Sequence, residues 1–223
     1  MHQRKSKKLL IYFFLLILFG SITNIKLTNL NFEKTININV SGLSNFENSN
    51  IRDKINDLKF KNIFFLNTIE ITNLINSDSL VESFVVFKKY PSTLDIEIVK
   101  TNFLARTNYN GKSLLIGSNG KFSEDRFLYD KLPFIYGKIE IKEFLEFKKI
   151  IDLSKLPYDQ IEKFYFFPSK RWDLKLKNNV LLKLSSKDPE TALDNALKIL
   201  QNEDLKNIKT LDARINNKII LNE

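Results

Sequence analysis

The residue types that most often carry catalysis are nearly absent from this chain of 223 residues. It contains no cysteine, and its single histidine is His2, close to the N-terminus. Beyond that histidine the chain lacks the residues for Ser–His–Asp or Cys–His catalysis. It also lacks those for disulfides and for zinc sites built from histidine and cysteine. The sequence therefore predicts no catalytic residue, no metal site and no cofactor.

A serine nucleophile paired with a lysine needs neither histidine nor cysteine, and one Ser-x-x-Lys pattern occurs, at Ser118-Asn119-Gly120-Lys121. Such a pair normally lies at the start of a helix, where the lysine follows the serine by one turn. Here Asn119-Gly120 is instead typical of a type I′ hairpin turn, because both residue types tolerate a positive φ. We interpret the pattern as the tip of a hairpin over 113–122.

Two other groups resemble chemical sites but have simpler interpretations. The carboxylate pairs Asp188/Glu190 and Glu203/Asp204 lie at the ends of an expected helix, where acidic residues serve as caps or face solvent. The aromatic run 164–167 with Trp172 fits alternate positions of a buried strand better than a stacking platform. There is no glycine-rich phosphate loop. We predict that the protein is not an enzyme and has no small-molecule substrate.

The N-terminus carries a membrane-insertion pattern, with four cations (Arg4, Lys5, Lys7, Lys8) before an apolar run from Leu9 to Gly20. Cations resist crossing the bilayer, so the N-terminus is predicted inside and the rest outside. Residues 9–25 would form about 26 Å of helix, near the short limit for spanning. Phe19 and Ser21 make a poor cleavage site, which favours an uncleaved anchor over a cleaved signal peptide. Representative anchor residues are Leu9, Phe14, Leu18 and Ile25.

The net charge of +9 falls to +5 when the four cations of the tail are set aside (9 − 4 = 5). The remaining cations are scattered rather than clustered, and the predicted compartment lies outside the cytoplasm. We therefore expect a lipid bilayer, and no nucleic acid, among the partners.

Hydrophobic periodicity predicts two folded domains behind the anchor. The first has a strand at 36–40, a helix capped around 48–50 and running through Leu58, a helix capped by Thr68, and strands at 81–87 and 94–99. The second consists mostly of strands, with helices over 140–153 and from Asp188-Pro189 to Leu200. Its further strands are expected at 161–167, 172–176, 180–184, 208–215 and 218–221, with turns at Asn178-Asn179 and Asn216-Asn217.

The predicted fold class is α+β. It comprises a single N-terminal transmembrane helix, a small β-α-α-β-β domain, and a mostly antiparallel β domain with two helices. The expected segments are a cytoplasmic tail (1–8), an anchor (9–25), a linker (26–35), the first domain (36–103) and the second domain (104–223).

Read in order, several short motifs resemble the FtsQ/DivIB family of cell-division proteins. Val40-Ser41-Gly42, the segment 62–66 and the Tyr90-Pro91 turn with its flanking strands resemble the family's POTRA domain. Leu132-Pro133-x-x-x-Gly137, Arg171-Trp172-x-Leu174 and Leu211-Asp212-x-Arg214 resemble elements of its β domain. After Ile98 the family's usual Glu-x-x-Pro-x-Ala-x-Trp run is reduced to Ala105. Each motif alone is weak, but the ordered series covers nearly the whole chain.

The resemblance implies a single-pass inner-membrane scaffold at the division septum, with the C-terminal domain in the periplasm. It implies binding to FtsB and FtsL, and through them control of the septal peptidoglycan synthases FtsW and FtsI. The expected mechanism is strand addition at an edge near the C-terminus, although 208–221 could simply close its own sheet. The predicted partner-binding residues are Leu211, Ala213, Ile215, Lys218, Ile219 and Leu221.

Two other classes of function remain as alternatives. One is a membrane-tethered cell-wall enzyme or peptidoglycan-binding module, which would need converging acid and base groups. The other is an outer-membrane assembly component, which normally has repeated POTRA units or a long barrel.

Overall fold

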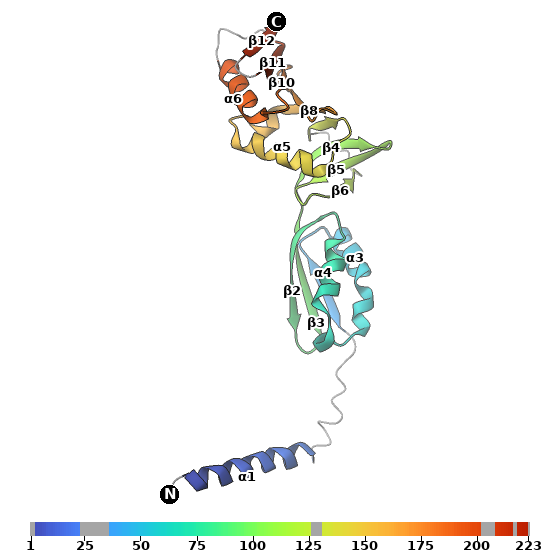
Figure 1. The fold of residues 1–223 in the computed structure, drawn as a ribbon. Coiled ribbons are helices and arrows are strands. Elements are labelled where there is room, and N and C mark those ends of the chain that lie inside the picture. The colour runs from blue at the N-terminus through green and yellow to red at the C-terminus, as the bar shows by residue number, and fades with distance from the viewer. Residues whose placement is uncertain (1–2, 23–35, 126–130, 202–207, 216–217, 223) are drawn as a thin grey trace.

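The computed structural model describes residues 3–22, 36–125, 131–201, 208–215 and 218–222. It contains an N-terminal helix and two folded domains, and Figure 1 shows the domains stacked end to end with β12 far from the first domain. The N-terminal helix, α1 (Gln3–Ile22), contains the apolar run, and its side chains from Leu9 to Phe19 are exposed. No helix in the described part of the chain is both long enough and apolar enough to cross a membrane. Ile25 lies outside the described residues.

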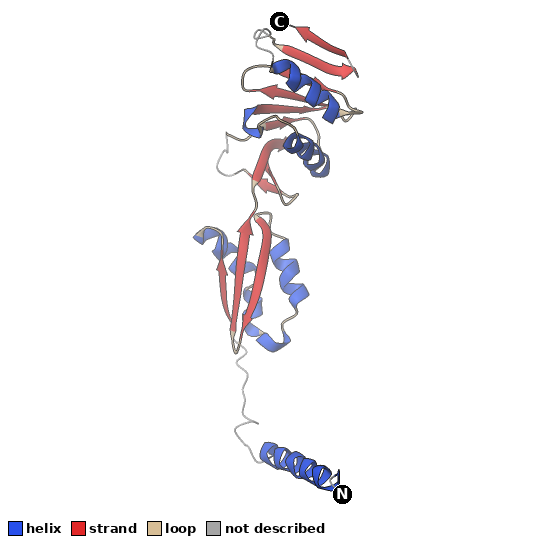
Figure 2. Cartoon of the chain, turned by 90° about the vertical axis from the view of Figure 1, so that its left-hand side faces the viewer, coloured by secondary structure: helices blue, strands red, loops and turns tan. Residues whose placement is uncertain are grey.

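The first domain has the predicted β-α-α-β-β order around a three-stranded sheet (Figure 2). Its elements are β1 (Asn37–Ser41), α3 (Asn45–Lys54), η1 (Asn56–Phe60), η2 (Ile63–Phe65), α4 (Thr68–Asn76), β2 (Val81–Lys89) and β3 (Thr93–Lys100). The strand order is β1-β3-β2, with β1 parallel and β2 antiparallel to β3. Alternate residues of β3 (Leu94, Ile96, Ile98) share one core with Ile55 and Ile75. The strand alternation read from the sequence is thus the buried side of this sheet.

Both helices of this domain begin at residues other than the predicted caps. The N-cap of α3 is Ser44, whose hydroxyl accepts from the N–H of Glu47, while the Glu47 carboxylate accepts from the N–H of Ser44. This reciprocal pair is a capping box, which satisfies two backbone donors at once. The predicted cap residue Asn48 lies inside the helix and bonds the backbone of Leu43. The cap of α4 is Asn67, one residue before the predicted Thr68.

Substitution Ser44→Ala is expected to lower the free energy of unfolding by about 1 kcal/mol, because it leaves the N–H of Glu47 without an acceptor. Chemical denaturation of the purified chain measures the change. Ser49→Ala is the matched control: Ser49 is exposed inside α3, and alanine there is expected to be neutral or slightly stabilising. Equal losses in the two variants would contradict the assignment of Ser44 as the cap.

The second domain is built on a nine-stranded sheet with the order β12-β11-β10-β9-β8-β7-β4-β5-β6. Three adjacent pairs are parallel (β4–β7, β7–β8 and β10–β11), and the other pairs are antiparallel. The strands are β4 (Phe103–Tyr109), β5 (Lys112–Gly117), β6 (Phe122–Glu124), β7 (Phe134–Tyr136), β8 (Ile161–Phe166), β9 (Trp172–Leu176), β10 (Leu181–Leu184), β11 (Thr210–Ile215) and β12 (Lys218–Asn222). The helices are α5 (Ile141–Leu153), η3 (Tyr158–Gln160) and α6 (Pro189–Leu200).

Aromatic residues form the centre of this second core, which confirms the packing interpretation of the aromatic run. Phe144 and Phe147 of α5 pack on Phe164 and Trp172, and the rings of Phe147 and Trp172 stack at 4.7 Å between centroids. Phe164 and Trp172 are both buried. These rings are therefore structural and do not form a surface for a ligand.

The turn predicted at Asn119-Gly120 is not of type I′, because only Gly120 has a positive φ there. The chain uses its other Asn-Gly pair in that way: Asn110 (φ 51°) and Gly111 (φ 79°) connect β4 to β5. Asn119 instead directs its side chain toward the first domain, where the amide donates to the carbonyls of Ser79 and Val81. Asn119 thus bonds the second domain to the first instead of forming the expected type I′ turn.

Candidate functional site

The C-terminal strand pair lies at one edge of the nine-stranded sheet (Figure 1). Strand β11 lies between β10 and β12, and β12 is the last strand in the order. Among the described strands, none pairs with the outer side of β12. An edge strand presents a row of backbone N–H and C=O groups that another strand can pair with.

The predicted partner-binding residues fall into two groups. Leu211 and Ala213 lie in β11, buried in the core, so their side chains are not available at the edge. Ile215 is exposed at the end of β11. Lys218, Ile219 and Leu221 lie on β12 itself.

Strand β12 presents apolar side chains on both of its faces. Ile219 packs against the core below α6. Ile220, which the sequence reasoning omitted, is opposite Asp212 in register and half exposed. The predicted set takes Ile219 and Leu221 from one face of β12 and Lys218 from the other.

A ladder of charged residues lies on the sheet face opposite α6 and leads toward this edge. Register places Asp173 of β9 opposite Lys183 of β10, and Lys183 opposite Asp212 of β11. Within β11 the Arg214 guanidinium donates to the Asp212 carboxylate at 2.5–2.9 Å. These bonds hold the pKa of Asp212 below its usual value, although partial burial opposes the shift. The motif Asp212-x-Arg214 is therefore an internal ion pair that braces β11.

Two glycines lie in the motifs that resemble the FtsQ/DivIB family, and the local backbone requires glycine at both positions. Gly42 has a φ of 103°, and a Cβ there would lie 1.8 Å from the carbonyl oxygen of Ile98. Gly137 has a φ of 110°, and a Cβ there would lie 2.2 Å from the carbonyl oxygen of Phe166. Each glycine lets a loop pass directly against a strand.

The two domains are joined by the β5–β6 hairpin, which bonds to the segment between α4 and β2. Asn119 donates to the carbonyls of Ser79 and Val81 at 2.9 and 2.8 Å. The Lys121 ammonium donates to the carbonyls of Asn76 and Asp78 at 2.5 and 3.1 Å. The Ser-x-x-Lys pattern thus supplies a structural clasp, and its Ser118 hydroxyl donates to the Glu82 carboxylate at 2.8 Å.

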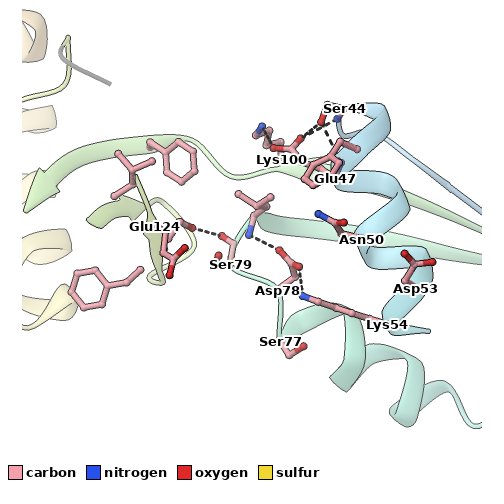
Figure 3. Close-up of a pocket in the computed structure, with 16 residues that line it drawn as sticks. Ser44, Glu47, Asn50, Asp53, Lys54, Ser77, Asp78, Ser79, Lys100 and Glu124 are labelled. Atoms are coloured by element: carbon pink, nitrogen blue, oxygen red, sulfur yellow. Dashed lines mark hydrogen bonds and ion pairs between the residues drawn. The ribbon is translucent and has the colours of Figure 1, made fainter. Parts of the chain in front are cut away.

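An open groove of about 1440 Å³ lies beside this joint (Figure 3). Both of its lysines are paired with carboxylates: Lys100 with Glu47 at 2.6 Å, and Lys54 with Asp78 at 2.5 Å. Burial would raise the pKa of Glu47, but hydrogen bonds from Lys100 and Ser44 outweigh it and keep this pKa below its usual value. An acid held ionised by a lysine is a poor proton donor near neutral pH. Within the described residues no cluster of acidic residues or histidine could hold a metal ion.

Comparison with known proteins gives matches over both domains. A profile for the POTRA domain, FtsQ-type, matches residues 34–100, and a profile for the cell division protein FtsQ/DivIB, C-terminal, matches residues 105–214. Relatives named cell division protein FtsQ include those of Rickettsia prowazekii (29% identity over 187 residues), Rickettsia typhi (27% over 187) and Rickettsia bellii (28% over 190). These matches cover 82–83% of this chain and 69–70% of the relatives.

A solved structure of the major extracytoplasmic domain of the cell division protein DivIB from Geobacillus stearothermophilus is a weaker neighbour. It covers 49% of this chain and 98% of its own, with 12% identity and a TM-score of 0.34, which is too low to support an argument. The ordered pair of family profiles and the agreement of curated relatives settle the family. The chain belongs to the FtsQ/DivIB family of cell-division proteins.

Proposed function

We propose that this protein is a non-enzymatic scaffold of the division septum that captures FtsB- and FtsL-type membrane proteins by strand addition at β12. The observation that carries the proposal is the outer side of β12, which no described strand pairs with, at the end of a sheet that packs on a buried core. Backbone bonds along the edge would supply affinity. The alternating Ile219, Ile220 and Leu221 side chains would supply specificity.

Through these partners the scaffold would help control the septal peptidoglycan synthases FtsW and FtsI. The groove beside the domain joint does not favour a hydrolase, because both of its lysines are paired with carboxylates and Glu47 is held ionised. We therefore assign no catalytic step to the chain.

Depletion of the protein is expected to produce long filaments that segregate their DNA but fail to constrict, because the synthases would not be assembled at the septum. Microscopy of depleted cells measures this. The purified chain, incubated with peptidoglycan, is expected to release no muropeptides. Normal division after complete loss, or measurable hydrolysis, would move the assignment to a membrane-tethered cell-wall enzyme.

The proposal places the N-terminus in the cytoplasm, residues 9–25 in the inner membrane and both folded domains in the periplasm. Its support is the asymmetric charge around the apolar run: four cations precede it, and its side chains are exposed in α1. Cations on one side of an apolar segment set its orientation.

Protease added to spheroplasts is therefore expected to digest the two folded domains and to leave an N-terminal tag protected and membrane-bound. Immunoblotting against the tag follows the protected fragment. A released mature protein beginning near residue 22 would contradict the uncleaved anchor.

A further inference from the structure

One end of the first domain carries a cluster of exposed aromatic and apolar side chains that no role described so far uses. Phe60 is 74% exposed and Phe65 85% exposed. The full cluster, called here the aromatic end, consists of Phe60, Phe64, Phe65, Ile69 and Tyr90.

The aromatic end is assembled from separate parts of the domain. Phe60 ends η1, Phe64 and Phe65 belong to η2, and Ile69 is in the first turn of α4. Tyr90 lies in the turn between β2 and β3, and its ring stacks on Phe64 with 4.7 Å between centroids. Exposed apolar side chains gathered at one end of a domain mark an interaction site more often than single scattered residues do.

This end is also where the chain enters the domain. The N–H of Ile36 donates to the carbonyl of Lys59 at 2.9 Å, and the N–H of Asn37 donates to the carbonyl of Ser92 at 2.7 Å. The start of β1 therefore lies between η1 and the β2–β3 turn, opposite the end that meets the β5–β6 hairpin (Figure 1). The aromatic end therefore lies at the same end of the domain as Ile36, the first described residue of that domain.

The chain length keeps this end near the anchor. From Ile25 to Ile36 there are eleven residue steps (36 − 25 = 11), which span at most about 40 Å when fully extended. A tether of this length keeps the aromatic end at a high effective concentration near the bilayer surface, so a weak contact suffices for association.

The chemistry of the aromatic end fits the interfacial region of a bilayer. Tyrosine rings are favoured at the headgroup level, where one side is apolar and the other wet, and exposed phenylalanines of peripheral segments bury at the boundary between headgroups and acyl chains. Lysines rim the cluster, but Lys61 pairs with Glu70 and Lys89 with Asp95. The charge of these two lysines is therefore offset by carboxylates, and we expect burial of the rings to contribute more to the contact than the attraction of these lysines to anionic lipid.

We propose that the aromatic end rests on the outer surface of the membrane in which the chain is anchored, a proposal that depends on the anchor proposed above. The partner is the lipid headgroup region itself. This contact would hold the first domain against the bilayer surface. The second domain and its β12 edge would extend away from that surface.

The test uses the full-length chain reconstituted in vesicles of phosphatidylethanolamine and phosphatidylglycerol. The absence of native cysteine allows single reporters: Thr68→Cys beside the aromatic end, Ser186→Cys in the second domain, and Leu16→Cys in the apolar run. Each is labelled with a fluorophore, and quenching by spin-labelled lipid is measured. We expect quenching at positions 68 and 16 and none at position 186.

Paired variants test whether the rings cause the contact. Phe60→Ser with Phe65→Ser, in the Thr68→Cys background, is expected to reduce lipid quenching to the level seen at position 186. Phe46→Ser is the matched control, because Phe46 is 69% exposed on α3 outside the aromatic end, and it should leave quenching at position 68 unchanged.

Quenching at position 16 without quenching at position 68 would overturn the membrane contact while leaving the anchor intact. Absence of quenching at position 16 would overturn the anchor and the contact together. Quenching at position 68 that persists in the double phenylalanine variant would show that the rings are not responsible. If the fluorophore at position 68 became buried only when another division protein was added, the aromatic end would be assigned to a protein partner. That result would also overturn the proposal.

Discussion

Proline placed in β12 is expected to weaken capture of the FtsB- and FtsL-type partners roughly fivefold or more. Proline removes a backbone donor and is excluded from the interior of paired strands. Loss of one donor leaves a carbonyl of the incoming strand unpaired, at a cost of about 1–3 kcal/mol, which corresponds to roughly 5- to 150-fold in affinity.

The position of the proline decides which edge of β12 is damaged. Successive N–H groups of a strand point to opposite edges, so those of Ile219 and Leu221 share one direction and that of Ile220 has the other. One direction faces β11 and the other faces the partner. We expect both Ile219→Pro and Ile220→Pro to weaken capture of the partner. Only the variant that loses an N–H facing β11 is expected also to lower the melting temperature of the chain.

Affinity measured by calorimetry, together with thermal unfolding of each variant, separates these effects. Lys218→Ala is the control on the same strand, because an exposed ion pair is worth about 0–1 kcal/mol and its loss leaves the backbone edge intact. If the proline variant with wild-type stability also bound with wild-type affinity, strand addition at β12 would be wrong, and the strand would merely complete its own sheet.

Substitution Gly137→Ala is expected to destabilise the second domain by about 2–5 kcal/mol, from forced overpacking together with a left-handed backbone. The new Cβ would lie 2.2 Å from the carbonyl oxygen of Phe166, and the φ of 110° is one that alanine rarely adopts. Because the obstacle is the backbone of β8, it cannot be relieved by a side-chain rotation.

Gly111→Ala is the matched control within the same domain. Its φ of 79° is also positive, but nothing lies within 4 Å of the added Cβ. Only the strain of a left-handed alanine remains, at about 1–2 kcal/mol. Chemical denaturation followed by the fluorescence of Trp172 compares the two variants, and equal losses would show that the contact with β8 is not responsible.

Elements with strong periodicity could be predicted from the sequence with near-correct bounds. Helix α5, helix α6 with its Asp188 cap, and the strand pair β2–β3 around Tyr90-Pro91 all appear where the pattern placed them. Periodicity reports which face of an element is buried, and that information is local. The ordered motifs also led to the correct family.

Some choices between local signals turned on details of spacing or on distant contacts. Asn48 and Ser44 are both good cap residues, but Glu47 follows Ser44 by three residues, which is the capping-box spacing that the sequence does show. The hydrogen bond from Lys100 of a distant strand to Glu47 adds to this preference. Two Asn-Gly pairs compete for the type I′ turn. Asn119 does not form such a turn because its side-chain amide donates to two carbonyls of the other domain.

The edge itself was predicted only in part, for a related reason. Leu211 and Ala213 alternate as an edge strand would, but alternation reveals the face of a strand and not its neighbours. The parallel pairing of β10 with β11 places these residues inside the sheet. Whether the edge binds a partner stays a prediction.

Apart from the Ser118–Glu82 bond, the clasp between the domains is chemically one-sided, and this has a consequence for how the chain can diverge. The hairpin gives side chains, Asn119 and Lys121, whereas the segment 76–81 gives four main-chain carbonyls to them. Every residue type has a carbonyl, so substitutions at Ser79 leave its acceptor in place, while a change at Asn119 removes two bonds at once. In a library of random substitutions, the acceptor segment should therefore tolerate variety at Asn76 and Ser79 that the donor hairpin does not.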